Sequence, residues 1–155
     1  LQTYLNDKLG KKVHGKIVKT RVDFDSYTEM NKIIKEFNPD AIGVSAMTFH
    51  KDFFHEAIKK IRDDGYKKTI IVGGPHPTTS FNEVMDDRNI DICVIGEGEI
   101  TLEEIVRKII QNNGVKLSDN DLNDIDGIAY NESDNFKIET HNLNKENIQA
   151  QTKLV

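Results

Sequence analysis

The chain has 155 residues, a formal net charge of −5 and a single cysteine, Cys93. One thiol excludes a disulfide framework and any zinc or iron–sulfur site that needs several thiolates from this chain. The acidic, interspersed charge argues against a nucleic-acid groove, and the apolar runs are far shorter than the roughly 20 residues of a membrane span. No signal-peptide pattern opens the sequence, so we expect a cytoplasmic domain with neither nucleic-acid nor membrane partners.

The first half of the sequence alternates between helical and extended patterns. Apolar residues at i, i+3 and i+4 spacing predict helices, a capping box of Ser26 and Glu29 begins the second of them, and Asn38–Pro39 ends it. The run AIGVSAM is continuously apolar, which is typical of a strand covered on both faces. The helices are expected at residues 1–9, 26–37 and 50–65, and the strands at residues 13–20 and 41–47.

The alternation continues in the second half. Two short apolar runs, residues 69–72 and 92–95, predict buried strands. Capping-box spacings predict a short helix that begins after Ser80 and a long helix that begins after Thr101 and ends near Gly114. Each expected strand is therefore followed by an expected helix.

Alternating helices and strands are typical of a doubly wound α/β fold with a parallel sheet, flavodoxin-like or Rossmann-like. Turn chemistry between residues 127–130 and 136–140 adds a C-terminal β-hairpin. Such a sheet ordinarily begins with a strand, so the opening helix implies that the first strand is missing. We expect an N-terminally truncated α/β domain, residues 1–116, and a hairpin with a polar linker, residues 117–155.

Three segments directly follow expected strands and are rich in small residues. In open α/β sheets, ligands bind beyond the carboxyl ends of the strands, and glycine there lets a ligand approach the backbone. A tight strand-to-helix turn explains the glycines of any one segment equally well, but the three segments together favour a binding cleft. The candidate cofactor-binding residues are Ser45, Ala46, Met47, Thr48, Gly73, Gly74, Pro75, His76, Gly96, Glu97, Gly98 and Glu99.

Other chemistry finds little support in the sequence. Residues 96–101 lack the third glycine of a dinucleotide-binding fingerprint, and Glu97 and Glu99 would repel a phosphate. His55 is expected on a helix face and Cys93 as an inert thiol in the core, whereas His76 is equally compatible with a ligand contact and a loop role. We assign no catalytic and no metal-ligating residue.

Four stretches of the sequence together resemble a known family over roughly residues 26–140. The family is the cobalamin-binding domain of cobalamin-dependent radical S-adenosylmethionine enzymes, and the sequence is most similar to the anaerobic magnesium-protoporphyrin IX monomethyl ester oxidative cyclase group. The stretches that carry the resemblance are Pro39–Ser45, Ile71–Thr78, Asp91–Glu99 together with Thr101 and Leu102, and Asp126–Tyr130.

The resemblance implies that a corrinoid, cobalamin, lies against the carboxyl ends of the strands with its nucleotide tail in the cleft. Ser45 would contact the tail, Gly73 and Gly74 would make room for it, and residues 96–99 would line the same cleft. The partner would be a radical S-adenosylmethionine barrel in the same full-length chain. That barrel, and not this fragment, would hold a 4Fe–4S cluster and S-adenosylmethionine.

Two departures limit what the resemblance carries over. The D-x-H-x-x-G motif, by which mutases and methionine synthase supply a histidine to cobalt, is absent, as is the three-cysteine motif of the radical domain. The expected function is therefore a cofactor domain that is not catalytic alone, cut from an oxidative cyclase or a methyltransferase. The alternative is a flavodoxin-like regulatory or interaction domain without a corrinoid.

Overall fold

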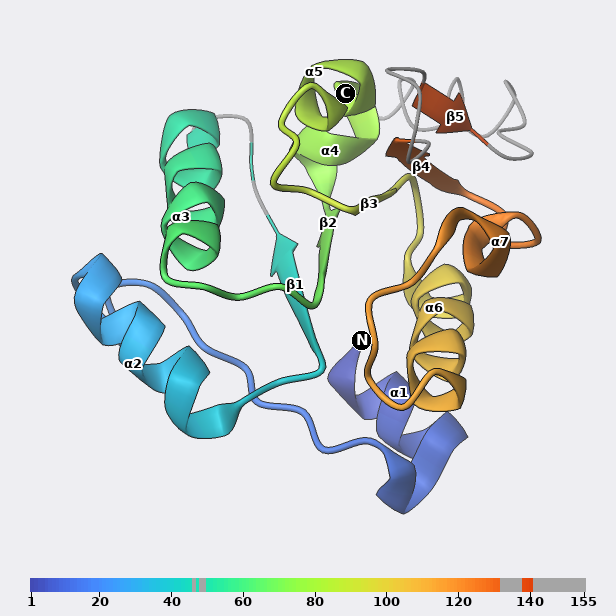
Figure 1. Cartoon of the computed structure of the whole chain (residues 1–155), viewed down its shortest axis with the longest axis horizontal. Helices are drawn as coiled ribbons and strands as arrows, with labels where there is room; N and C mark the ends of the chain where they lie inside the picture. Colours follow the sequence, from blue (N-terminus) through green and yellow to red (C-terminus); the bar gives the residue numbers. More distant parts are fainter. Residues whose placement is uncertain (46, 48–49, 132–137, 141–155) are drawn as a thin grey trace.

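The structure, a computed structural model, describes residues 1–45, 47, 50–131 and 138–140 (Figure 1). Within those residues, no helix is both long enough and apolar enough to cross a membrane. The elements in chain order are α1 (Gln2–Leu9), a 3-10 turn (Gly10–Lys12), α2 (Tyr27–Phe37), β1 (Ala41–Ser45), α3 (Lys51–Asp63), β2 (Thr69–Gly73), α4 (Pro75–Thr79), α5 (Phe81–Met85), β3 (Ile92–Val94), α6 (Glu99–Gln111), α7 (Asp119–Leu122), β4 (Ile128–Asn131) and β5 (Ile138–Thr140).

The strands form one mixed sheet in the order β1-β2-β3-β4-β5. β1, β2 and β3 are parallel, because α3 and the α4–α5 pair each return the chain to the start of the next strand. β4 then pairs antiparallel with β3, and β5 pairs antiparallel with β4. The predicted C-terminal hairpin is present, and it extends the sheet.

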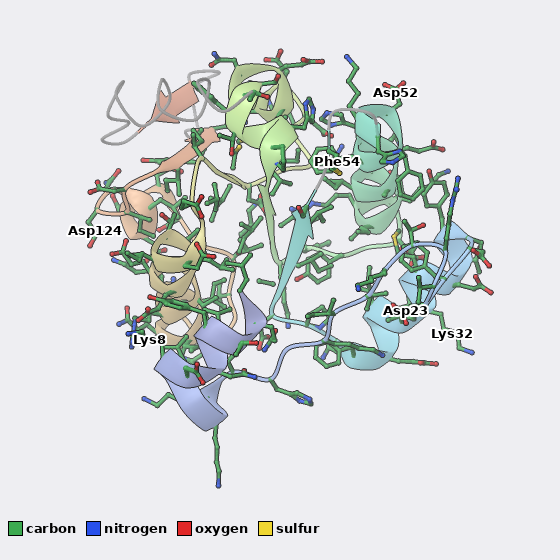
Figure 2. All side chains as sticks on the ribbon, turned by 180° about the vertical axis from the view of Figure 1, so that it is seen from behind. Lys8, Asp23, Lys32, Asp52, Phe54 and Asp124 are labelled. Atoms are coloured by element: carbon green, nitrogen blue, oxygen red, sulfur yellow. The ribbon has the colours of Figure 1, made fainter. Side chains whose placement is uncertain are left out.

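Two apolar clusters lie on opposite faces of this sheet. One contains Phe54 of α3 and buried residues of α5, and the other contains Ile105 of α6 and Leu122 of α7. Figure 1 shows α2 and α3 on one side of the sheet and α6, with α1 packed against it, on the other. Figure 2 shows Phe54 in the interior and the charged side chains of Lys8 and Asp124 at the periphery. The doubly wound α/β architecture predicted from the sequence is confirmed.

The region after α6 shares the core of the α/β unit. Leu117, Ile125 and Ile128 are buried in the same cluster as the inner face of α6. The division of the chain at residues 116 and 117 stays a prediction, and residues 141–155, expected to be a linker, lie outside the described residues.

The strand predicted at residues 13–20 is wrong. The chain is irregular there, an isolated bridge joins Thr20 to Phe24, and most of the side chains are exposed. A strand is stable only with a hydrogen-bonded neighbour and a face to bury, and the described part of this segment has neither.

β1 is an edge strand and is not covered on both faces, as its apolar run had suggested. Gly43 and Ser45 are exposed, whereas the first four residues of β2 are buried. The difference follows from position, because β2 pairs with a strand on each side and the described β1 pairs with β2 alone.

The predicted helix caps are confirmed in one case of three. Ser26 Oγ accepts from the N–H of Glu29 at 3.2 Å, and the Glu29 carboxylate accepts from the N–H of Ser26 at 3.2 Å, as in a capping box. Hydrogen bonds from backbone N–H groups lower the pKa of Glu29. Ser80 makes no cap bond to α5, and α6 begins at Glu99, which places Thr101 inside its first turn.

Candidate functional site

The carboxyl ends of β1, β2 and β3 meet along one side of the sheet, called the carboxyl edge below. Ser45 ends β1 and pairs with Gly73, which ends β2. Val72 of β2 pairs with Cys93 of β3, so the register places Val94, the last residue of β3, beside Gly73. The three segments predicted from the sequence therefore begin side by side.

A hydrogen bond joins the second segment to the third. The N–H of Gly96 donates to Thr78 Oγ1 at 3.1 Å, and the N–H of Thr78 donates to the carbonyl of Gly74 at 3.0 Å. Thr78 lies in α4, which directly follows the end of β2. α4 thus holds the two glycine-rich turns in a defined relation to each other.

The fold requires glycine at two positions of these two segments and does not require it at two others. Gly74 and Gly96 have φ angles of 101° and 83°, a backbone region that side chains disfavour, so the turns themselves require glycine. Gly73 and Gly98 do not have a positive φ. A Cβ at Gly73 would lie 3.7 Å from the Cβ of Val94, and a Cβ at Gly98 would lie 3.5 Å from its Cγ1.

Both of those distances are ordinary van der Waals contacts. The described fold could therefore carry a side chain at Gly73 and at Gly98, and yet it carries none. The two glycines flank Val94 and leave backbone accessible at the point where the second and third segments meet. Backbone without side chains, at positions where the fold does not need glycine, is the kind of feature that a closely approaching ligand requires.

The first segment is exposed where it is described. Ser45 is exposed at the end of β1, and the side chain of Met47 is 56 % exposed. Ala46 and Thr48 were also predicted to bind the cofactor, and both lie outside the described residues.

The third segment brings negative charge to the carboxyl edge. Glu97 is exposed, and Glu99 is half-buried in the first turn of α6. The positive end of the helix dipole favours a carboxylate there. These two carboxylates already occupy the start of α6, as its dipole favours.

The second segment places its residues in opposite environments. Pro75 is exposed as the first residue of α4, whereas His76 is 1 % exposed. The His76 ring packs edge-on against the rings of Phe54 and His55 of α3, with centroid distances of 6.2 and 6.5 Å. The side chain of His76 thus packs toward α3 in the interior. Its contact with a cofactor stays a prediction.

The described residues hold neither a metal-binding cluster nor an activated thiol. They contain no cluster of three or more His, Cys, Asp or Glu side chains that could hold a metal ion. Cys93 is fully buried, and desolvation raises the pKa of its thiol to about 12, so it is not a nucleophile. The chemistry that the carboxyl edge can perform is to bind and orient a ligand.

Sequence reasoning missed two residues that shape this edge. Thr78 lies in a stretch that carried the resemblance, but its hydrogen bond to Gly96 spans 18 residues and leaves no local pattern. Val94 belongs to an apolar run, and such a run indicates a strand without showing which of its residues meets the neighbouring turn.

The chain is similar in sequence and in fold to several known proteins. A family model described as the B12 binding domain matches residues 12–106. An uncharacterized methyltransferase of Pyrococcus horikoshii is 28 % identical over 131 residues, which are 84 % of this chain and 27 % of that protein. The cytidylyl-2-hydroxyethylphosphonate methyltransferase of Streptomyces wedmorensis is 32 % identical over 71 residues, which are 45 % of this chain and 13 % of that protein.

A solved structure shares the fold. The N-terminal domain of a hypothetical protein from Thermotoga maritima superposes with a TM-score of 0.51 at 25 % sequence identity, and the match covers 72 % of this chain and 82 % of that one. The chain spans about a quarter or less of the length of the two methyltransferase-named relatives. Because the family model covers more than half of its residues, the chain belongs to the B12-binding domain family.

Proposed function

We propose that the chain binds cobalamin at the carboxyl edge of its sheet. The observation that carries the proposal is the pair of glycines, Gly73 and Gly98, which flank Val94 although the fold does not require glycine at either position. Family membership supplies the class of ligand. A corrinoid is bulky and rimmed by amides, so it needs backbone donors and little side-chain bulk nearby, and the residues present fit it.

Each segment has a separate task in this proposal. Gly73 and Gly98 leave room for the nucleotide tail, and Gly74 and Gly96 shape the turns that hold them. Ser45 ends β1 beside Gly73 and is exposed, so its hydroxyl is available to hydrogen-bond the tail. When bound, cobalamin supplies the chemistry at cobalt, and this chain binds and orients it.

We further propose that the domain serves a methyltransferase of the radical S-adenosylmethionine type. Two matched relatives have methyltransferase names, and this chain spans only a part of each. The resemblance of the glycine-rich segments supports a radical barrel in the same full-length chain. With Cys93 as its single thiol, this chain needs another part of the protein to hold the 4Fe–4S cluster and S-adenosylmethionine. Oxidative cyclisation is a second candidate reaction and rests on the resemblance alone.

A titration with hydroxocobalamin tests the binding proposal. The chain should bind it and change the absorption spectrum of the corrin. Gly73→Val should weaken binding by at least about tenfold, because the new side chain occupies the space beside Val94 that the ligand would need. The far-ultraviolet circular dichroism of the variant should stay close to that of the unaltered chain, since a Cβ fits at this position.

Gly43→Val is the matched control. Gly43 is also a strand glycine without a positive φ, and a Cβ there would meet no atom within 4 Å. It should bind hydroxocobalamin as the unaltered chain does. A folded chain that leaves the corrin spectrum unchanged would contradict the proposal and favour a flavodoxin-like regulatory or interaction domain without a corrinoid.

A further inference from the structure

A buried histidine beneath the carboxyl edge has no hydrogen-bond partner. Nδ1 and Nε2 of His76 are both buried, and neither has a partner among the described residues. An imidazole always has at least one N–H to donate and, when neutral, one nitrogen to accept. Leaving these atoms unpaired in the interior destabilises the fold, so this arrangement calls for a functional explanation.

One side chain that contacts His76 and carries polar atoms is His55 of α3. His55 Nδ1 lies 2.7 Å from the carboxylate Oδ2 of Asp87, in the segment after α5. The carboxylate favours a proton on Nδ1 of His55, and in the neutral ring Nε2 is then the acceptor. The centroids of the His55 and His76 rings are 6.5 Å apart and the rings are perpendicular, so the two rings are neighbours, and a hydrogen bond between them requires His76 to move toward α3.

His76 is also close in the chain to the proposed ligand site. Gly74 and Pro75 precede it directly, and Gly74 carries the positive φ that turns the chain from β2 into α4. α4 has five residues and packs against α3 through the ring of His76. A ligand that presses on Gly73 and Gly74 therefore acts on the helix that carries His76.

We propose that His76 is a positioning residue for the cofactor: when the ligand occupies the carboxyl edge, α4 shifts toward α3 and His76 donates a hydrogen bond to Nε2 of His55. The inference rests on the proposed function. The series of hydrogen bonds from Asp87 through His55 to His76 then holds the Gly74–Pro75 turn against the ligand. Because both nitrogens of His76 lack a partner among the described residues and one would gain a partner with ligand bound, the hydrogen bond favours the bound conformation and contributes to affinity.

His76→Phe tests the inference, since phenylalanine keeps a ring in the slot and removes both nitrogens. The variant should unfold at the same temperature as the unaltered chain or higher, because no unpaired polar atom is buried. It should nevertheless bind hydroxocobalamin about tenfold more weakly. A residue that only fills space would not separate stability from affinity in this direction.

A double-mutant cycle identifies the partner. His55→Phe should weaken binding of hydroxocobalamin by a similar factor, and the double variant should bind no more weakly than either single variant, because all three lack the same hydrogen bond. The exposed His14, replaced by Phe, is the control and should leave the affinity unchanged.

The proton-detected nitrogen spectrum of the histidine rings gives a second readout that does not depend on variants folding. One ring nitrogen of His76 should move to a hydrogen-bonded shift when hydroxocobalamin is added. Binding by the unaltered chain with equal affinity in the variants, or a His76 nitrogen already hydrogen-bonded without ligand, would overturn this inference and leave the proposed function standing. No binding by the unaltered chain would overturn both.

Discussion

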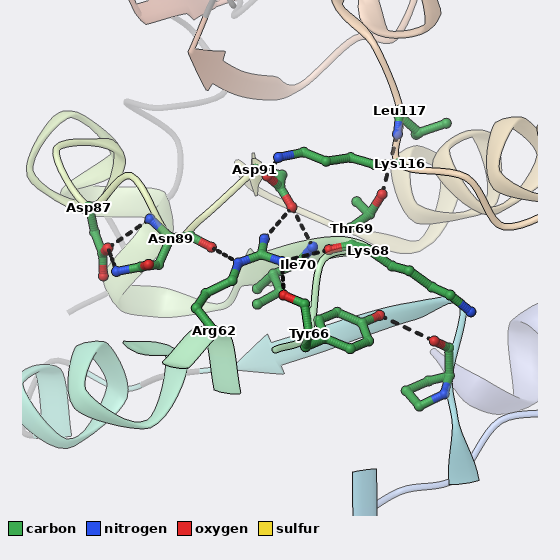
Figure 3. A network of polar contacts seen from close by, with 11 residues as sticks. Arg62, Tyr66, Lys68, Thr69, Ile70, Asp87, Asn89, Asp91, Lys116 and Leu117 are labelled. Atoms are coloured by element: carbon green, nitrogen blue, oxygen red, sulfur yellow. Dashed lines mark hydrogen bonds and ion pairs between the residues drawn. The ribbon is translucent and has the colours of Figure 1, made fainter. Parts of the chain in front are cut away.

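The two edges of the sheet differ in the kind of residue that builds them. At the amino edge, where β2 and β3 begin, Arg62 and Asp91 form an ion pair of 2.6 Å, and their side chains are only 15 % and 11 % exposed (Figure 3). Arg62 also donates to the carbonyls of Tyr66, Lys68 and Asn89. At the carboxyl edge, β1 ends in the exposed Ser45 and β2 in Gly73, and Gly96 and Gly98 follow the end of β3.

Asp91 connects four parts of the fold at the amino edge. Its carboxylate accepts from Arg62 of α3 and from the N–H of Ile70 of β2 at 2.7 Å, and it pairs with Lys116 after α6 at 2.6 Å. Ion pairs and side-chain hydrogen bonds therefore hold the strands together at the amino edge. The carboxyl edge contributes less to stability and can present its backbone to a ligand.

The largest expected effect comes from breaking the amino edge. Asp91→Ala leaves Arg62 without its anionic partner in a nearly buried position and removes the acceptor for the N–H of Ile70. Loss of one partner from such a pair should lower the free energy of unfolding by about 3 kcal/mol. Urea unfolding followed by circular dichroism measures it.

Asp124→Ala is the control for that experiment. Asp124 pairs with Lys108, but it is exposed, and an exposed ion pair contributes little to stability. A loss for Asp91→Ala as small as that for Asp124→Ala would contradict the contrast between the edges.

A second prediction concerns Cys93, which lies in β3 beneath α4. Desolvation raises the pKa of the thiol from 9.0 to about 12, so the folded chain keeps this proton at a pH where the unfolded chain loses it. The thiol therefore contributes stability below pH 9, and that contribution is lost as the pH rises toward 12. Between about pH 8 and about pH 10 the free energy of unfolding should fall by about 1.4 kcal/mol from this group.

Comparison with Cys93→Ala isolates the thiol, because other groups titrate in the same range in both proteins. Between about pH 8 and about pH 10, the free energy of unfolding should fall by about 1.4 kcal/mol less in Cys93→Ala than in the unaltered chain. Ellman's reagent should react with Cys93 only on unfolding. Rapid reaction in the folded chain would mean that the carboxyl edge opens in the native state. The difference in stability between the two edges would then include the buried strand β3.

The smallest expected effect concerns the link between the two glycine-rich turns. Thr78→Val leaves the N–H of Gly96 without its acceptor, which should lower the free energy of unfolding by about 1 kcal/mol. Hydroxocobalamin should bind several-fold more weakly, because the turns are no longer held in one arrangement. Thr79→Val, whose hydroxyl donates only within α4, is the matched control and should bind normally. Equal affinities would show that the bond does not organise the site.

Patterns with a strong local period predicted most of the fold. The stripes of α2, α3 and α6 and the apolar runs of β2 and β3 depend on residues that are neighbours in the sequence, and the structure has all five. The strand expected at residues 13–20 and the covering expected for β1 depend on which strand lies alongside. A local pattern carries no information about the partner, so those two predictions failed.

The candidate site divides in the same way. Topology alone predicted that the segments after β1, β2 and β3 begin at one edge. The fold does not require glycine at Gly73, whereas Gly74 has a positive φ. This difference depends on backbone angles, which cannot be read from the amino-acid sequence. The burial of His76 depends on where α3 packs, which no residue of its own segment reveals.

The most direct test of the account is an amide chemical-shift map of the chain with and without hydroxocobalamin. The account predicts that the amides that move on binding belong to Gly73, Gly74, Gly96 and Gly98, while those of Ile70 and Leu117 at the amino edge keep their positions. Shifts centred on the amino edge, or a folded chain whose spectrum does not change, would contradict it.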